Sequence, residues 1–225
     1  MSLYLIKLRK CGWVLLTIGI IDVGIMIYCI VNKISYSSSF NIFAIIAGVY
    51  LIRGNLKAAR LTSFFAAFLF SGFTGFLLIL PFLLPLDLLT VYAKLHSIYV
   101  LLYAVLMPLI LYMLMWIYKK LTSPDVIDAM KAAGINISSF WRNPKSGFWV
   151  GSGVVVLILI VSLIPFYGEA RERAKQKASL EVGPNYKLHI SSFNVSYVGG
   201  NKYIHATITA YNASAIKNIT VDWQE

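Results

Sequence analysis

Long apolar runs constrain this chain more than any other feature of its sequence. The first run extends from Cys11 to Val31 and contains a single charged residue, Asp22. A helix needs about 20 predominantly apolar residues to cross the hydrocarbon core of a bilayer, which is about 30 Å thick. Charged residues normally supply much of the surface of a soluble protein, whereas only 13% of these residues are charged and 59% are hydrophobic. The run therefore predicts a membrane protein.

Five such segments predict a polytopic α-helical membrane protein with about five transmembrane helices. Proline is expected to end the third segment at Pro81 and to kink the fourth segment at Pro108. The second segment is the shortest, and serines occupy its first turn. The predicted spans are Cys11–Val31, Tyr36–Ile52, Leu61–Leu83, Tyr92–Tyr118 and Phe148–Phe166.

Cations gather at alternate ends of these segments and predict the orientation of the chain. Lys7, Arg9 and Lys10 precede the first span, and residues 53–60 contain three cations. Two lysines follow the fourth span. Because loops rich in Lys and Arg stay in the cytoplasm, we expect a cytoplasmic N-terminus and an extracytoplasmic C-terminal domain in a bacterial-type inner (plasma) membrane. This pattern also explains the net charge of +11 without a nucleic acid partner.

The change from apolar to charged and then to alternating sequence predicts four regions. The first is a four-helix transmembrane region, followed by a cytoplasmic loop. The third is the fifth transmembrane helix with a charged helical extension, and the last is a small extracytoplasmic β domain. In that order, the regions cover residues 1–118, 119–147, 148–182 and 183–225.

The cytoplasmic loop is predicted to contain one short amphipathic helix. Ser123 and Pro124 are typical of the first positions of a helix, and Gly134 is typical of its end. Val126 and Met130 would share one side of this helix. We expect this apolar side to rest on the membrane surface.

Apolar and polar residues alternate near the C-terminal end, which is the period of a half-buried β-strand. A Gly-Gly turn at residues 199–200 predicts a hairpin in which Val195 faces Ile204. A shift of one residue would separate the apolar sets of the two strands. A third strand is expected around residues 219–223, and a bulge or a separate short strand near Ser191.

This three-stranded sheet would have exposed edges and one apolar face. The face must be covered by the charged helix, by the membrane surface or by a protein partner. We predict a protein partner in addition to membrane lipid. The residues expected to contact the partner are Phe193, Val195, Tyr197, Ile204, Ile208 and Trp223.

Asp22 is the main candidate for chemistry inside the membrane, because a charge at the centre of a transmembrane helix costs roughly 3 kcal/mol. It could bind a cation or relay a proton in a small carrier or channel. Alternatively, a protonated Asp22 could be held by a hydrogen bond from Ser71, Thr74 or a tyrosine hydroxyl. The sequence leaves both alternatives open.

Small residues predict where helices approach each other closely. Gly147, just before the fifth predicted span, and Gly151 within it are one turn apart, and Gly72 and Gly75 lie in the third span. Such spacing lets helices pack within one bundle or in a homo-oligomer.

The sequence indicates no enzyme, cofactor or metal site. No nucleophile elbow, phosphate-binding loop or HExxH motif occurs. His189 and His205 are expected to lie too far apart in the predicted sheet to share a metal ion. Cys11 and Cys29 would be about 27 Å apart along one helix and cannot form a disulfide.

The last third of the chain resembles the N-terminal helix and sheet of type IV pilins in the order of its elements. The order begins with the apolar helix from Gly147 and continues through Pro165 and the charged residues 171–178 to the sheet. Ser152 stands where a pilin would have its assembly glutamate, and Pro165 does not match the pilin position. The resemblance therefore implies a membrane helix that runs into a small sheet, and not membership of the family.

Two functional hypotheses follow. The first is a non-enzymatic membrane protein that acts through protein–protein contact, as an accessory subunit of an envelope complex or as an immunity-type protein against a membrane-acting toxin. The alternative is a small carrier or channel that uses Asp22.

Overall fold

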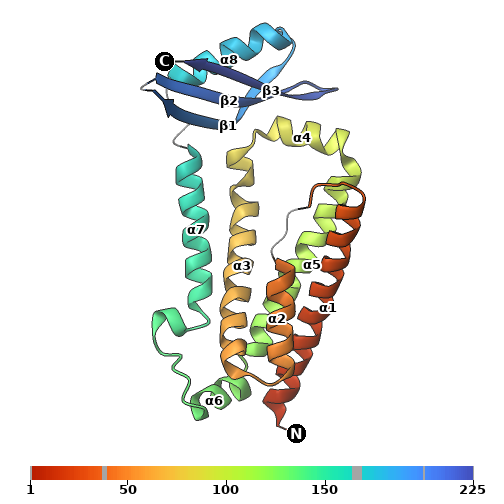
Figure 1. The fold of residues 1–225 in the computed structure, drawn as a ribbon, viewed down its shortest axis with the longest axis vertical. Helices are drawn as coiled ribbons and strands as arrows, with labels where there is room; N and C mark the ends of the chain where they lie inside the picture. Colours follow the sequence, from red (N-terminus) through yellow and green to blue (C-terminus); the bar gives the residue numbers. More distant parts are fainter. Residues whose placement is uncertain (1, 37–39, 164–168, 200, 225) are drawn as a thin grey trace. The chain divides into compact units, whose positions relative to one another are not determined.

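The computed structural model describes residues 2–36, 40–163, 169–199 and 201–224. Figure 1 shows that most of this chain is helical, with a small sheet near the C-terminus. The chain packs into two compact units, and three helices contribute residues to both. The four predicted regions follow chain order rather than packing and stay a prediction. The first unit comprises Met1–Thr74 and Leu109–Gly153, and the second comprises Gly75–Pro108 and Val154–Glu225.

In the first unit, α1 (Leu3–Val31) and α2 (Phe40–Ile52) lie side by side as an antiparallel pair (Figure 1). Their backbones meet at two glycines. A Cβ atom on Gly12 would lie 2.8 Å from the carbonyl oxygen of Gly48, and a Cβ atom on Gly48 would lie 2.8 Å from that of Gly12. Only hydrogen fits at either position, since a larger side chain would push the two helices apart.

Both helices differ from their predicted bounds. α1 begins eight residues before Cys11, because its first turns are helical although they carry the cations that precede the span. Tyr36 was predicted to begin the second span, but it lies outside the helix. The serines at 37–39 are outside the described residues.

The third helix, α3 (Leu56–Leu83), starts within the segment that was predicted to be a loop. Gly54 has a positive φ of 78°, which lets the chain turn sharply after α2. The side-chain oxygen of Asn55 then accepts hydrogen bonds from the backbone N–H groups of Lys57 and Ala58. These bonds satisfy donors in the first turn of α3, so that the helix can begin only three residues after Arg53.

The helix in the loop was predicted correctly, but its expected place on the membrane surface was wrong. This helix, α6 (Pro124–Ala132), follows Ser123 and has proline in its first turn. Val126 and Met130 are 0% exposed, because they belong to a protein core that also contains residues of α1 and α5. In addition, Lys7 of α1 forms an ion pair with Asp125. α6 is therefore fixed to the protein through its apolar side.

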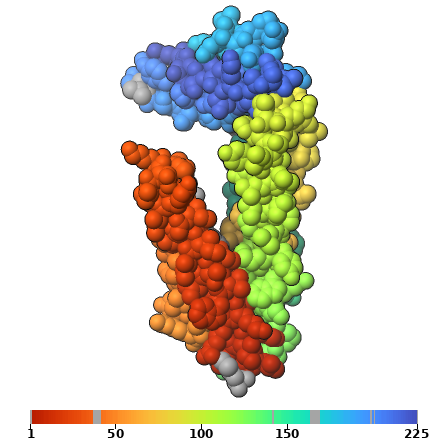
Figure 2. Space-filling model, turned by 90° about the vertical axis from the view of Figure 1, so that its right-hand side faces the viewer, coloured from red at the N-terminus to blue at the C-terminus, as the bar shows by residue number. Residues whose placement is uncertain are grey.

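Among the described residues, three helices are long and apolar enough to cross a membrane: α1, α3 and α5 (Ser97–Leu121). Only 11% of the most apolar window of each helix is buried by protein, which suits segments surrounded by lipid. Figure 2 shows one side of α1 uncovered along its length. Two shorter apolar helices accompany them, Ile42–Ile52 within α2 and Ser146–Ser162 within α7 (Ser146–Leu163). A 3-10 turn, η1 (Phe140–Arg142), precedes α7.

The fourth predicted span is wrong at its beginning. Residues 86–121 form two helices, α4 (Leu86–Leu95) and α5, with a break at His96. α4 is amphipathic, with Asp87 in its first turn and Lys94 in its last, so both charges complement the helix dipole. It belongs to the second unit and not to the span.

The C-terminal sheet has the predicted hairpin and register. Strands β1 (Lys187–Val198), β2 (Asn201–Tyr211) and β3 (Ile216–Gln224) pair antiparallel in the order β1-β2-β3. Val195 faces Ile204 as expected. The register shifts between Ile190 and Ser192, which confirms the bulge near Ser191.

Helix α8 (Glu169–Val182) covers the apolar face of this sheet. Ala174 and Ala178 of α8 are both 0% exposed and pack against Ile208 and Val221. The small alanine side chains let α8 lie close to the strands. The charged segment is helical from Glu169 to Val182, as predicted. Its predicted continuity with the last span falls on residues 164–168, which lie outside the described part of the chain.

Candidate functional site

Asp22 lies in α1 and accepts a hydrogen bond from the hydroxyl group of Tyr36, with an O–O distance of 2.7 Å. Both side chains are half-buried. Val31 ends α1 nine residues beyond Asp22, so Tyr36 reaches back about 14 Å along the helix. Tyr36 therefore lies back alongside α1, at the level of Asp22.

Asp22 also lies at about the same height along the helix axis as the first residue of α2. Asp22 follows Gly12 by ten residues, and Phe40 precedes Gly48 by eight. Because the two glycines touch and the helices are antiparallel, Asp22 and Phe40 lie within about 3 Å of the same axial level. A carboxyl group near a helix N-terminus interacts favourably with the helix dipole and with unpaired N–H groups.

These contacts favour the structural alternative for Asp22. The hydroxyl group of Tyr36 donates a hydrogen bond to the carboxyl group of Asp22. A tyrosine hydroxyl was one of the hydrogen-bond donors expected from the sequence. Ser71 instead donates to carbonyl oxygens of its own helix, and the buried hydroxyl of Thr74 has no hydrogen-bond partner in the described chain. Residues 23–86 contain no Asp or Glu. A carrier would need further ionisable groups at this depth.

A second polar cluster joins α4 to the base of the hairpin. The carboxylate of Asp87 forms an ion pair with Lys187 of β1. It also accepts a hydrogen bond of 3.0 Å from the hydroxyl group of Tyr211 in β2. Lys187 and Tyr211 face each other across the two strands, so that one carboxylate binds both.

Apolar contacts surround this cluster. Leu88 and Val91 of α4 pack against Tyr211, and these three side chains are 1%, 9% and 4% exposed. Strand residues alternate between the two faces of a sheet. Tyr211 therefore projects on the face opposite Ala210, which lies under α8. We call Asp87, Leu88, Val91, Lys187 and Tyr211 the α4–sheet joint.

Sequence reasoning missed this joint because it assigned α4 partly to a loop and partly to a span. The spacing of Leu88 and Val91 is helical, and Asp87 and Lys94 are placed as helix-end charges. These features signalled an amphipathic helix. Nothing in the sequence indicated that the helix would pack against a strand more than 100 residues away.

Contacts within the α4–sheet joint shift the pKa values of Asp87 and Tyr211. The hydrogen bond from Lys187 is the largest cause that holds the pKa of Asp87 below its usual value, and the Tyr211 hydroxyl acts in the same direction. For Tyr211, loss of hydration and then the carboxylate of Asp87 raise the pKa to about 12. Asp87 is thus ionised and Tyr211 neutral across the physiological pH range.

The residues predicted to bind a partner divide into three groups. Ile204 and Ile208 are 1% and 0% exposed and cannot contact another protein in this structure. Phe193 and Trp223 are half-buried and pack edge to face beside α8. Val195 and Tyr197 lie outside the cluster that packs against α8, and their side chains are 44% and 72% exposed.

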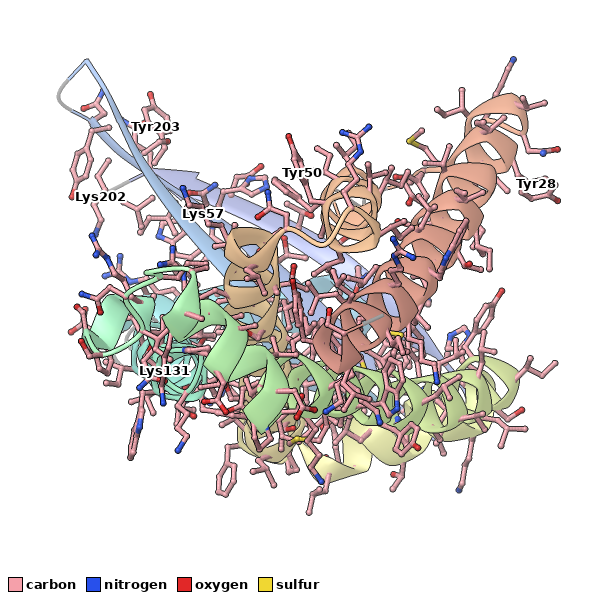
Figure 3. All side chains as sticks on the ribbon, turned by 90° about the horizontal axis from the view of Figure 1, so that it is seen from below. Tyr28, Tyr50, Lys57, Lys131, Lys202 and Tyr203 are labelled. Carbon is pink, nitrogen blue, oxygen red and sulfur yellow. The ribbon has the colours of Figure 1, made fainter. Side chains whose placement is uncertain are left out.

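The free end of the hairpin is therefore the exposed part of the sheet. Tyr203 of β2 is 40% exposed on the other face of the same end. Figure 3 labels Tyr203 and Lys202 there, at the end of the hairpin. We call Val195, Tyr197 and Tyr203 the hairpin-end surface.

The histidines of the sheet occupy separate places. His189 lies on the edge strand β1, and His205 contacts Asp222 across β2 and β3. Burial lowers the pKa of His189, and the positive charges of Arg171 and Lys175 lower it further. The described residues contain no group of three or more His, Cys, Asp or Glu side chains that could hold a metal ion.

Three of the four predicted packing glycines contact another helix. A Cβ atom on Gly147 would collide with the carbonyl oxygen of Phe64 in α3, and one on Gly151 would collide with Ser71. One on Gly75 would lie 2.9 Å from Val155 of α7. Among the described residues nothing lies within 4 Å of the corresponding point on Gly72. For Gly72, packing in an oligomer stays a prediction.

Comparisons with known proteins add no relative. No protein-family model, curated protein or solved structure matches the chain. The functional argument therefore depends on the geometry of the chain alone.

Proposed function

We propose that this chain is a non-enzymatic integral membrane protein that binds another protein through the hairpin-end surface. In this proposal the chain crosses the membrane five times, with α2 and α7 as the two short crossings. The N-terminus is cytoplasmic and the β domain is extracytoplasmic. An accessory subunit of an envelope complex and an immunity-type protein both fit this description.

The observation that supports the proposal best is the exposure of Val195 and Tyr197 on a face that is otherwise covered. α8 covers this face at Ala206, Ile208 and Ala210. Ile204 is also buried, and Val195 and Tyr197 continue the same face beyond it. Aromatic residues with a polar group are enriched at protein interfaces, because they combine a large apolar area with a hydrogen bond. Tyr197 and Tyr203 both have this character.

The α4–sheet joint supports the same reading. The base of the hairpin is fixed by Asp87 and by the contact of Leu88 and Val91 with Tyr211. A surface that is fixed before binding loses less conformational entropy when a partner binds. We infer that fixing the base in this way limits the conformations of the hairpin before a partner binds.

Site-specific photocross-linking in the native membrane tests the proposal. A photoreactive amino acid replaces Tyr197, and the control variant carries it at Thr220, which is exposed on the other face of the sheet. We expect one dominant protein adduct from position 197 and none from position 220. Addition of Val195→Ser should weaken the adduct, since it removes apolar area beside the probe.

Two results would count against the proposal. One is the absence of a protein adduct at position 197 in correctly inserted protein. The other is the same set of adducts from both positions, which would indicate random collision rather than a binding surface.

A further inference from the structure

An apolar groove opens between α2 and α3 in the first unit. Phe43, Ile46 and Tyr50 line it on α2, and Leu61 and Phe65 line it on α3. Its volume is about 440 Å³. Protein interiors contain few voids larger than a water molecule, whereas ligand sites usually measure about 300–1,000 Å³. This α2–α3 groove is therefore large enough for a ligand.

The walls of the groove indicate a hydrocarbon ligand. Phe43 is 69% exposed, and Leu61 and Phe65 are 54% and 49% exposed. All three belong to helices that we assign to the membrane. Small side chains, among them Ala47 and Ala58, leave the space between these larger residues. In a bilayer the groove would face lipid chains.

Both walls end in a cation at the same end of the groove. On α3, Lys57 precedes Leu61 and Phe65 at a spacing of four residues, so that all three share one side of the helix. On α2, Arg53 follows Tyr50 by three residues, just beyond the end of the helix. Figure 3 shows Tyr50 and Lys57 on the same side of the protein, on neighbouring helices.

The charge around this end is uncompensated in the sequence. Residues 23–86 contain no Asp or Glu, while Arg53, Lys57 and Arg60 lie within eight residues. Arg53 and Lys57 are both exposed. Clustered cations beside a membrane helix attract anionic lipid headgroups. A partner helix in the groove would match only its apolar walls, whereas an anionic lipid would match both the walls and these cations.

We propose that the α2–α3 groove binds one anionic phospholipid from the leaflet next to residues 53–60. An acyl chain occupies the groove between Phe43 and Phe65, and the phosphate lies between Arg53 and Lys57. The site is independent of the partner that the hairpin-end surface binds. The proposal holds for either orientation of the chain, because the lipid comes from the leaflet next to residues 53–60.

Native mass spectrometry of the delipidated full-length protein tests the proposal. The protein is titrated with phosphatidylglycerol and with phosphatidylcholine of the same acyl chains. We expect tighter binding of phosphatidylglycerol, and a roughly fivefold loss of affinity for each cation removed in Arg53→Gln and Lys57→Gln. Lys131→Gln is the control, because Lys131 is an exposed lysine on α6, no residue of α6 lines the groove, and Asp128 already pairs with its charge.

A second pair of variants tests the apolar part of the site. Ala47→Phe should fill the groove and reduce the binding of both lipids, whereas Val156→Phe on the exposed side of α7 should not. Ala58→Phe fills the groove from α3 if Ala47→Phe does not fold. Equal binding of the two lipids, or unchanged binding in the filled variants, would overturn the proposal. So would a protein dimer that forms in place of the lipid adduct and is disrupted by Ala47→Phe.

Discussion

At the scale of single residues, two glycines decide how closely the first helices pack. Gly12 and Gly48 bring the backbones of α1 and α2 together, and no sequence motif connects them because they are 36 residues apart. By contrast, the spacing of Gly147 and Gly151 signalled a packing surface, since the two residues are one turn apart on the same helix. Local spacing can thus predict one side of a contact, but not its partner.

We predict that Gly12→Ala destabilises the protein and Gly24→Ala does not. The new methyl group at position 12 would lie 2.8 Å from a backbone oxygen, while position 24 has no neighbour within 4 Å among the described residues. Overpacking typically costs about 1–3 kcal/mol, whereas alanine in place of an unpacked helical glycine stabilises by about 0.5–1 kcal/mol. Thermal unfolding of both variants in detergent micelles checks this. Equal unfolding temperatures would show that the contact is absent.

His189 gives a prediction about pH. Its pKa is lowered in the folded protein, mainly by burial and then by Arg171 and Lys175. The unfolded chain therefore binds a proton first as the pH falls through about 6.5. The stability that depends on neutral His189 is present above this pH and is lost as the pH falls through the lower folded value.

The pH prediction can be measured by thermal unfolding at pH 7.5 and pH 5.5. The unfolding temperature of the β domain should fall between these values, and His189→Gln should reduce the fall. His205→Gln is the control at an exposed histidine in the same sheet. The explanation would be wrong if His189→Gln left the pH dependence unchanged.

At the scale of elements, local signals predicted the hairpin and α6 but not α4. The alternation around Val195 and Ile204 and the Gly-Gly turn allow only one register, and Ser123-Pro124 marks the start of α6. The chain from Tyr92 to Tyr118 is apolar enough to look like one span. The helix before the break at His96 packs against Tyr211 through Leu88 and Val91, and this tertiary contact has no local signal in the sequence.

The α4–sheet joint leads to a prediction about local opening. Leu88→Ala should increase hydrogen–deuterium exchange near Tyr211, because truncation of a buried leucine costs about 2–5 kcal/mol. Leu86→Ala is the matched control on the same helix, since Leu86 is 67% exposed and Leu88 is 1% exposed. Exchange measured by mass spectrometry on the full-length protein should separate the two. If both variants exchange like the parent protein, α4 does not hold the hairpin.

At the scale of the whole molecule, the charge pattern and the folded tail lead to one account. Cations near α1, between α2 and α3, and after α5 predict the cytoplasmic side. In the proposed function, the β domain lies on the other side and presents the hairpin-end surface to a partner. The sequence predicted that an apolar sheet face needs cover, but only the structure shows that α8 supplies most of it. Which side chains stay exposed could not be predicted without the position of α8.

The most direct test of this account is cysteine labelling in intact cells. The two native cysteines are first replaced by serine, and Tyr197→Cys or Lys57→Cys is then introduced. A membrane-impermeant maleimide should label position 197 in intact cells and position 57 only after the membrane is opened. Labelling of position 57 in intact cells, or labelling of position 197 only after the membrane is opened, would contradict an extracytoplasmic hairpin end.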